Sequence, residues 1–244
     1  GCTVTNNGAT TGLVTTNSGT VTANYGTVTT NSSGATVTNN VFGATIATND
    51  GQVIENYGAI NIINNGTVID NYGTVSDNSN AITTNRNGGV VLSNNATVTT
   101  NALGGTVVTN QSGATVTTNE GSITTNLSGG TVATNASDGE VVTNNGTVTT
   151  NSSGGTVTVN VSGGTVTTNS GTVAENRSGG VVTTNASGGV VSSNYNGGII
   201  TTNASGGRVD NNLYGATITN QNGTLRIGTV TGGTGNIMAS HATE

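Results

Sequence analysis

Charged side chains are the first candidates for chemistry in this sequence of 244 residues, and they are few. A general acid–base pair needs convergent groups whose pKa values suit proton transfer. The cations are Arg86, Arg177, Arg208 and Arg226, widely separated along the chain, and the single histidine, His241, stands near the C-terminal end. These groups predict no catalytic constellation. We therefore expect the protein not to be an enzyme.

Carboxylates offer a candidate metal site. Glu55 and Asp70 occupy the same position of a repeat, two repeats apart, and Asp77 follows one repeat later. If the chain brings Glu55 and Asp70 together, a calcium ion could bridge them, because hard cations take carboxylate oxygens. The simpler alternative is a solvated pair of like charges. The sequence predicts this alternative, with no metal and no cofactor.

A short repeat separates these charged residues. From Gly146 to Asn212 an aliphatic residue recurs every seven to nine residues, and an asparagine follows three residues after each. The two columns are Val148, Val157, Val166, Val173, Val182, Val191, Ile200 and Val209, and Asn151, Asn160, Asn169, Asn176, Asn185, Asn194, Asn203 and Asn212. A repeat this short cannot fold alone, so it must be one side of a coil that stacks on its neighbours.

The residue types predict an all-β fold, a β-solenoid. Valine and threonine favour strands, and residues that alternate along a strand point to opposite faces. The valine therefore points inward and its threonine neighbours outward. The second residue after the valine is acidic in several repeats, as in Glu55 and Glu175, so burial there would be costly and the strand should bend. The asparagine then lies at a corner, where side-chain amides can form a ladder between coils, and glycine completes the turn where a positive φ is needed.

The number of repeats in each coil follows from the tyrosines. Tyr25, Tyr57 and Tyr72 lie in repeats separated by even counts, as do Tyr195 and Tyr214. If like residues stack, each coil contains two repeats, or 14–18 residues when repeats of seven to nine are paired. Three repeats in each coil, with a triangular cross-section, remains the alternative.

We expect a single solenoid domain over residues 1–222, with an irregular start at 1–18 and a non-repeat tail at 223–244. The net charge of −6 argues against nucleic acid as a partner, because phosphate binding needs clustered cations. No apolar run approaches the ~20 residues that span a bilayer, so we expect no membrane insertion.

The run Asn24-Tyr25-Gly26-Thr27-Val28-Thr29-Thr30-Asn31 fits the pattern N-x-G-T-V-x-x-N. This pattern resembles the repeats of bacterial and phage β-helical surface proteins, which include autotransporter passenger domains, filamentous-haemagglutinin-like adhesins and tail fibres. The resemblance covers most of residues 12–222. It implies an elongated, structural or adhesive protein located outside the cell or on its surface, and it carries no functional residues over to this chain.

Outward apolar residues predict a candidate assembly surface, since contiguous exposed apolar patches often mark partner surfaces. Its members are Ile54, Tyr57, Ile69, Tyr72, Val181, Val190 and Ile199. Exposed strand edges at the ends of a solenoid also template pairing with another chain. We therefore expect a homo-oligomer, a head-to-tail polymer that forms an extracellular fibre or surface filament.

Two alternative functions stay open. The outward Thr-x-Thr pairs resemble the faces of insect and bacterial ice-binding solenoids, although they occur in repeats throughout the chain. An adhesin stalk or a phage tail-fibre segment is the other alternative. Sequons such as Asn126-Leu127-Ser128 follow from the repeat itself, and most should stay unmodified if their asparagines face inward. Glycans on exposed threonine or serine remain a candidate modification.

Overall fold

The computed structural model describes residues 2–8 and 11–226. The chain divides into two compact units, Gly1–Ile123 (unit 1) and Thr124–Glu244 (unit 2). All regular secondary structure in the described residues is β-strand. The prediction of an all-β chain is confirmed.

Unit 1 contains two sheets of parallel strands, one formed by the odd-numbered and one by the even-numbered strands. The odd strands are β1 (Thr3–Asn7), β3 (Thr20–Asn24), β5 (Thr36–Asn40), β7 (Gln52–Asn56), β9 (Thr67–Asn71), β11 (Ala81–Asn85), β13 (Thr97–Asn101) and β15 (Thr115–Asn119). The even strands are β2 (Leu13–Asn17), β4 (Thr27–Asn31), β6 (Thr45–Asn49), β8 (Ala59–Asn64), β10 (Thr74–Asn78), β12 (Val90–Asn94) and β14 (Thr106–Asn110).

Unit 2 repeats this arrangement after β16 (Ser122–Asn126), which crosses the boundary of the two units. Its odd strands are β17 (Thr131–Asn135), β19 (Thr147–Asn151), β21 (Thr165–Asn169), β23 (Val181–Asn185), β25 (Ile199–Asn203) and β27 (Thr217–Gln221). Its even strands are β18 (Glu140–Asn144), β20 (Thr156–Asn160), β22 (Thr172–Asn176), β24 (Val190–Asn194), β26 (Arg208–Asn212) and β28 (Thr224–Leu225).

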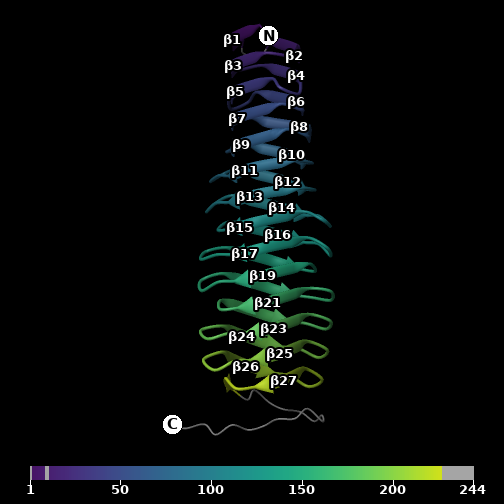
Figure 1. Ribbon diagram of the computed structural model, residues 1–244, viewed down its shortest axis with the longest axis vertical. Helices are drawn as coiled ribbons and strands as arrows, with labels where there is room; N and C mark the ends of the chain where they lie inside the picture. Colours follow the sequence, from purple (N-terminus) through teal and green to yellow (C-terminus); the bar gives the residue numbers. More distant parts are fainter. Residues whose placement is uncertain (1, 9–10, 227–244) are drawn as a thin grey trace. The chain divides into compact units, whose positions relative to one another are not determined.

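Within each unit, strands that are two positions apart in the chain pair in parallel, as the stacked arrows show (Figure 1). The register places equivalent positions of the repeat side by side: Val148 lies beside Val166, and Asn151 beside Asn169. Each turn of the solenoid therefore contains two repeats. The two-repeat prediction is confirmed, and the triangular alternative is wrong.

The interior contains one aliphatic and one asparagine side chain from almost every strand. In β19, Val148 and Asn151 are fully buried, whereas Thr147, Thr149 and Thr150 face outward to different degrees. Two consecutive residues between the valine and the asparagine stay outside, so the strand departs from strict alternation. The second residue after the valine is thus not buried, as expected, and this explains how acidic residues are accommodated at this position.

The buried asparagines form hydrogen-bonded ladders. Along the odd strands of unit 2, each Nδ2 donates to the Oδ1 of the asparagine in the next coil, at 2.7–2.8 Å, through the series Asn135, Asn151, Asn169, Asn185 and Asn203. The same Nδ2 groups also donate to backbone carbonyls, as Asn151 does to Thr172 O at 3.0 Å. These paired contacts satisfy a buried amide that would otherwise destabilise the fold. The predicted asparagine ladder is confirmed.

The turns come in two lengths, and glycine has two different roles in them. In the longer turn after β19, Gly154 adopts a φ of 84°, which favours a residue without a Cβ. Gly155 has no positive φ, but a Cβ there would lie 2.6 Å from Asn135 O. The prediction that paired glycines supply positive φ is therefore correct for the first glycine only, and close packing explains the second. Asp138 takes the left-handed position in one turn, with a φ of 66°.

Irregular features interrupt this pattern at a few positions. Strand β8 has one extra residue between Ile60 and Asn64, and its pairing with β6 and β10 shifts register there. At the end of unit 2, Gln221 replaces an asparagine and still accepts from Asn203 Nδ2 at 3.1 Å. The first residues of the predicted tail form β28, which pairs with β26. Residues 227–244, which include His241, lie outside the described part of the chain.

The ladder predicts the cost of removing one amide. Asn151→Ala leaves the ladder partners of that amide, the Asn135 donor and the Asn169 acceptor, without their contact to it. We expect a loss of about 3 kcal/mol in the free energy of unfolding, because a buried polar group that loses its partner costs roughly 1–3 kcal/mol. Denaturant unfolding followed by circular dichroism measures this loss.

The matched control is Thr149→Ala, a change at an exposed residue of the same strand. Its effect should stay within about 1 kcal/mol, the range of strand propensities. Equal effects of the two substitutions would show that the ladder does not stabilise the coil.

Candidate functional surfaces

The first candidate surface contains the acidic residues of unit 1. Strands β7 and β9 place Glu55 directly beside Asp70, as expected for two repeats in each turn. Asp70 is paired with Arg86, whose Nε donates to Asp70 Oδ1 at 2.8 Å. Asp77 lies on β10, in the other sheet, so the three acids do not converge.

This arrangement favours a charge pair over a metal site at Asp70. Arg86 already supplies a positive charge there, and it is more exposed than Asp70, with side-chain exposures of 44% and 21%. Solvent screens an exposed pair of this kind, so it contributes little to stability. No group of three or more His, Cys, Asp or Glu side chains that could hold a metal occurs in the described residues.

The other described arginines also have acidic partners. Arg177 contacts Glu175 on β22, and Arg208 contacts Asp210 on β26. Arg226 lies 4.0 Å from the same Asp210 carboxylate. All three pairs belong to the even strands of unit 2 or to residues beside them. Each of the described arginines thus lies in a local ion pair.

Ile54, Tyr57, Ile69 and Tyr72 come together in unit 1, on strands β7 and β9 and the residues that follow them. The β7–β9 register places Ile54 beside Ile69. The rings of Tyr57 and Tyr72 stack with their centroids 4.6 Å apart and their planes 5° from parallel. In this half of the candidate assembly residues, the structure therefore places two isoleucines side by side and two tyrosines side by side.

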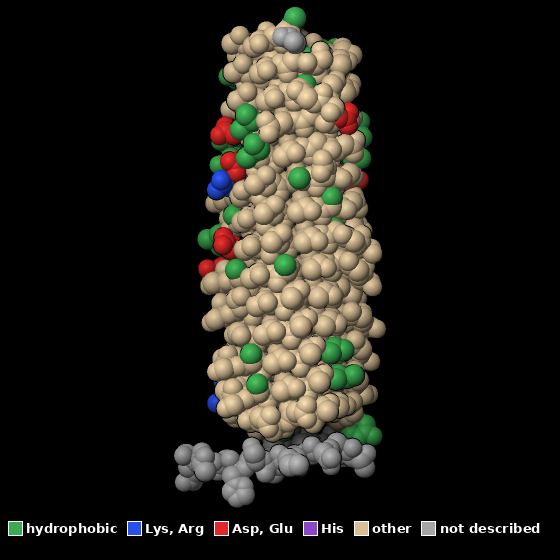
Figure 2. Space-filling view, viewed as in Figure 1, with side chains coloured by type: hydrophobic (Ala, Val, Ile, Leu, Met, Phe, Trp, Pro, Cys, Tyr) green, Lys and Arg blue, Asp and Glu red, His purple; other side chains and the backbone are tan. Residues whose placement is uncertain are grey.

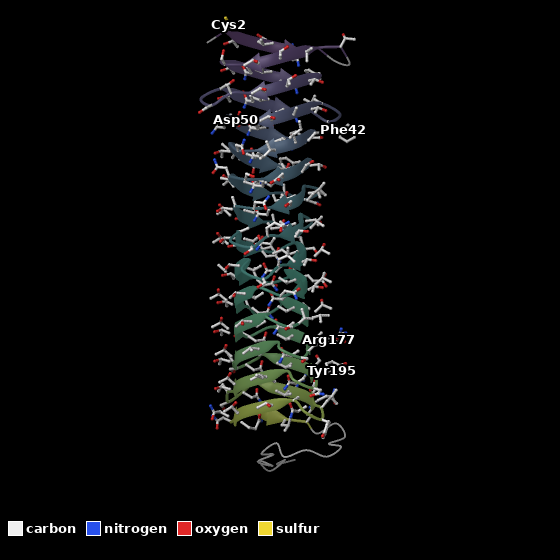
Figure 3. All side chains as sticks on the ribbon, turned by 90° about the vertical axis from the view of Figure 1, so that its right-hand side faces the viewer. Cys2, Phe42, Asp50, Arg177 and Tyr195 are labelled. Carbon is white, nitrogen blue, oxygen red and sulfur yellow. The ribbon has the colours of Figure 1, made fainter. Side chains whose placement is uncertain are left out.

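Further aromatic and apolar residues lie at the turns that follow the odd strands of unit 1. We define the aromatic corner as Tyr25, Val41, Phe42, Tyr57 and Tyr72. Backbone bonds connect three of its turns, from Val41 N to Asn24 O and from Tyr57 N to Asn40 O. Phe42 is 92% exposed and projects away from the ribbon (Figure 3). Figure 2 shows apolar and acidic side chains gathered along the left-hand edge of unit 1.

In unit 2 the candidate assembly residues do not form one surface. Val181 on β23 lies beside Ile199 on β25, both in the odd-numbered strands. Val190 lies on β24, between Thr172 and Arg208 of the even strands. Successive repeats alternate between the two sheets. Val190 therefore lies on the sheet opposite to Val181 and Ile199, although the three residues occupy the same position of their repeats.

The structure also reveals a regular surface that the sequence analysis did not separate. The odd strands β17 to β25 of unit 2 present outward threonines in three columns, one before and two after the buried valine. We call this set the threonine face of unit 2. Its members are Thr131, Thr147, Thr165, Thr149, Thr167, Thr183, Thr201, Thr134, Thr150, Thr168, Thr184 and Thr202.

The two sheets of unit 2 differ in charge. The odd strands β17 to β27 contain no charged residue. The even strands contain Glu140, Glu175, Arg208 and Asp210. In unit 1 the odd strands β11, β13 and β15 are likewise uncharged and threonine-rich. Sorting the repeats by odd and even position would have revealed this difference from the sequence.

The asparagines of several glycosylation sequons are buried in the solenoid. Asn126, Asn135 and Asn185 are fully buried, and their amides belong to the ladder. A folded chain cannot present such an amide to a glycosylating enzyme. At the described N-terminal end, Cys2 is exposed and has a free thiol (Figure 3).

Comparison with known proteins gives no family for this chain: a scan against family models and searches of curated proteins and of solved structures return no significant match. Within the described residues, no helix is long and apolar enough to cross a bilayer.

Tyr57 is the titratable group that best reports the environment of the aromatic corner. Partial burial raises the pKa of its hydroxyl, and the negative charge of Glu55 raises that pKa further, with smaller contributions from Tyr72 and Asp70. The hydrogen bond from Arg86 to Asp70 likewise raises the pKa of the guanidinium. In the folded chain, Tyr57 should therefore stay neutral at pH values where a free tyrosine ionises.

This environment predicts the effect of neutralising one acid. Glu55→Gln should lower the pKa of Tyr57 towards its ordinary value, because it removes a negative charge that disfavours the phenolate. The titration is measured from phenolate absorbance, and the difference between each protein and its Tyr57→Phe derivative isolates the one ring.

Glu140→Gln is the matched control, since it neutralises an acid on β18 of unit 2. It should leave the Tyr57 titration unchanged. A Tyr57 pKa that is insensitive to Glu55→Gln would mean that the carboxylate does not act on the ring.

Proposed function

We propose that this chain is a structural protein that assembles end to end into an extracellular fibre or surface filament. The observation that supports this proposal is the self-similarity of the coils. Each coil presents to the next the same parallel register of valine beside valine and asparagine beside asparagine. A surface that pairs with a copy of itself inside the chain can also pair with the corresponding surface of another chain.

The N-terminal coil offers such a surface. Among the described strands, β1 pairs with β3 and β2 pairs with β4, each on one side only. Unpaired edge groups template strand addition. The ladder has a direction, because Asn7 Nδ2 donates towards Asn24 Oδ1. The oxygen of Asn7 is thus the group that an amide from an incoming coil would meet.

The energetics of the fold agree with assembly by coil addition. In a solenoid each coil contacts its neighbours alone, so stability is a sum of nearest-neighbour terms. One added coil would form two strand pairings and extend two asparagine ladders and two valine columns. Since the two asparagine columns are uncharged, the net charge of −6 does not oppose contact at the coil ends themselves.

The same geometry supports a rigid spacer more generally. An adhesin stalk or a phage tail-fibre segment would use the stacked coils to hold another domain at a distance. We place the filament first because the repeated register makes the coil surface self-complementary. We propose in addition that the chain is not an enzyme, in line with the paired and dispersed charges of the described residues.

The assembly proposal predicts the effect of removing the first ladder acceptor. Asn7→Leu keeps a side chain of similar size, but it cannot accept a hydrogen bond from an incoming coil and loses the bond that Asn7 donates to Asn24. Addition of another coil should therefore be disfavoured, and circular dichroism checks that the variant stays folded. We expect filaments of the unmodified chain in negative-stain micrographs and shorter filaments or single particles for this variant.

Asn6→Leu provides the control, because Asn6 is an exposed residue of the same strand. This control should assemble as the unmodified chain does. Isolated particles of the unmodified chain at high protein concentration would overturn the filament proposal.

A further inference from the structure

The threonine face of unit 2 has a regular chemical pattern. Its strands pair without a bulge, and Thr150, Thr168 and Thr184 lie side by side in one column. Threonine is β-branched and has few χ1 rotamers. Neighbouring threonines in one column therefore tend to place their hydroxyl and methyl groups at the same positions, coil after coil.

Two repeat lengths describe this pattern. Adjacent strands lie about 4.8 Å apart, and alternate residues of one strand lie roughly 6.6 Å apart. Thr165 and Thr167 are such an alternate pair on β21, and Thr147 and Thr149 form the same pair on β19. The faces of hexagonal ice likewise arrange oxygen atoms in rows with a shorter and a longer repeat. Water bound to these hydroxyls would thus be held near positions of an ice lattice.

The hydroxyl and methyl groups of the threonines favour an ordered layer of bound water. A hydroxyl donates and accepts hydrogen bonds, so it can anchor a water molecule. A methyl group restricts the orientations of the water beside it. Charged groups would instead orient water around themselves, and the strands β17 to β27 contain none.

We propose that the threonine face of unit 2 binds ice. This activity goes beyond the structural role proposed above and does not rest on it. A protein partner fits this face less well, since the cores of protein interfaces are enriched in aromatic residues, methionine and arginine. The face offers none of these, and the bulkiest apolar neighbours are Val181 and Ile199 at one margin.

The opposite sheet of the same unit supplies an internal comparison. Its strands interrupt the threonine columns with Val159 on β20, with Glu175 on β22 and with two ionised residues on β26. Its outward pattern therefore lacks a constant spacing of hydroxyl groups. If the ordered pattern is what binds ice, one sheet of unit 2 should be active and the other inactive.

The test is thermal hysteresis and partitioning of the full chain into a growing ice front. Thr167→Lys places a charged, bulky side chain in the middle of the face, on β21. The control is Ser192→Lys, which introduces the same side chain at the corresponding position of β24 on the opposite sheet. We expect hysteresis in the unmodified chain, its loss in Thr167→Lys and its retention in Ser192→Lys.

Folding is checked separately by circular dichroism. If Thr167→Lys unfolds the chain, Thr149→Lys replaces it, because Thr149 is exposed on β19 and should tolerate the change. Absence of hysteresis in the unmodified chain would overturn the proposal, as would equal losses in the variants of the two sheets. Sedimentation distinguishes a further outcome: self-association that Thr167→Lys abolishes, without hysteresis, would assign the face to a second copy of the chain and overturn ice binding.

Discussion

The hydrogen bond between buried asparagine amides in consecutive coils is the interaction on which this structure depends. A chain with 31% hydrophobic residues cannot rely on a large apolar core. The ladder allows a polar side chain to fill half of the interior while its donor and acceptor are both used. It also requires register, because an amide displaced by one residue would leave its partner buried and unsatisfied. Stability and register therefore arise from the same contact.

The interior was largely predictable because its constraint is local. Val148 and Asn151 stand three residues apart in sequence, as do their counterparts in nearly every repeat, and this spacing alone indicates both columns. The tyrosine spacing gave the number of repeats in each turn, since Tyr57 and Tyr72 stack in adjacent coils. The extra residue of β8 is also visible in the sequence, where three residues instead of two separate Ile60 from Asn64.

The surfaces were less predictable, because they depend on which repeats become neighbours. Val190 was grouped with Val181, although the structure places the two residues on different sheets. The threonine face was missed for the same reason, since its rows are interleaved in sequence with charged rows of the other sheet. The roles of Gly154 and Gly155 also differ through contacts with the preceding coil, and no local pattern reports such contacts.

The alternation of repeats between two sheets has a consequence for how such a gene can change length. Loss or duplication of two consecutive repeats removes or adds a whole turn and leaves each later repeat on its own side. A change of one repeat reverses the parity of all that follow, so that rows such as Thr165–Asn169 and Thr172–Asn176 would exchange sides. The valine and asparagine columns would still be continuous, but strands with charged residues would then lie within the uncharged sheet. A solenoid of this type can thus keep its fold when any number of repeats is lost or duplicated. It keeps the composition of its two surfaces only when that number is even.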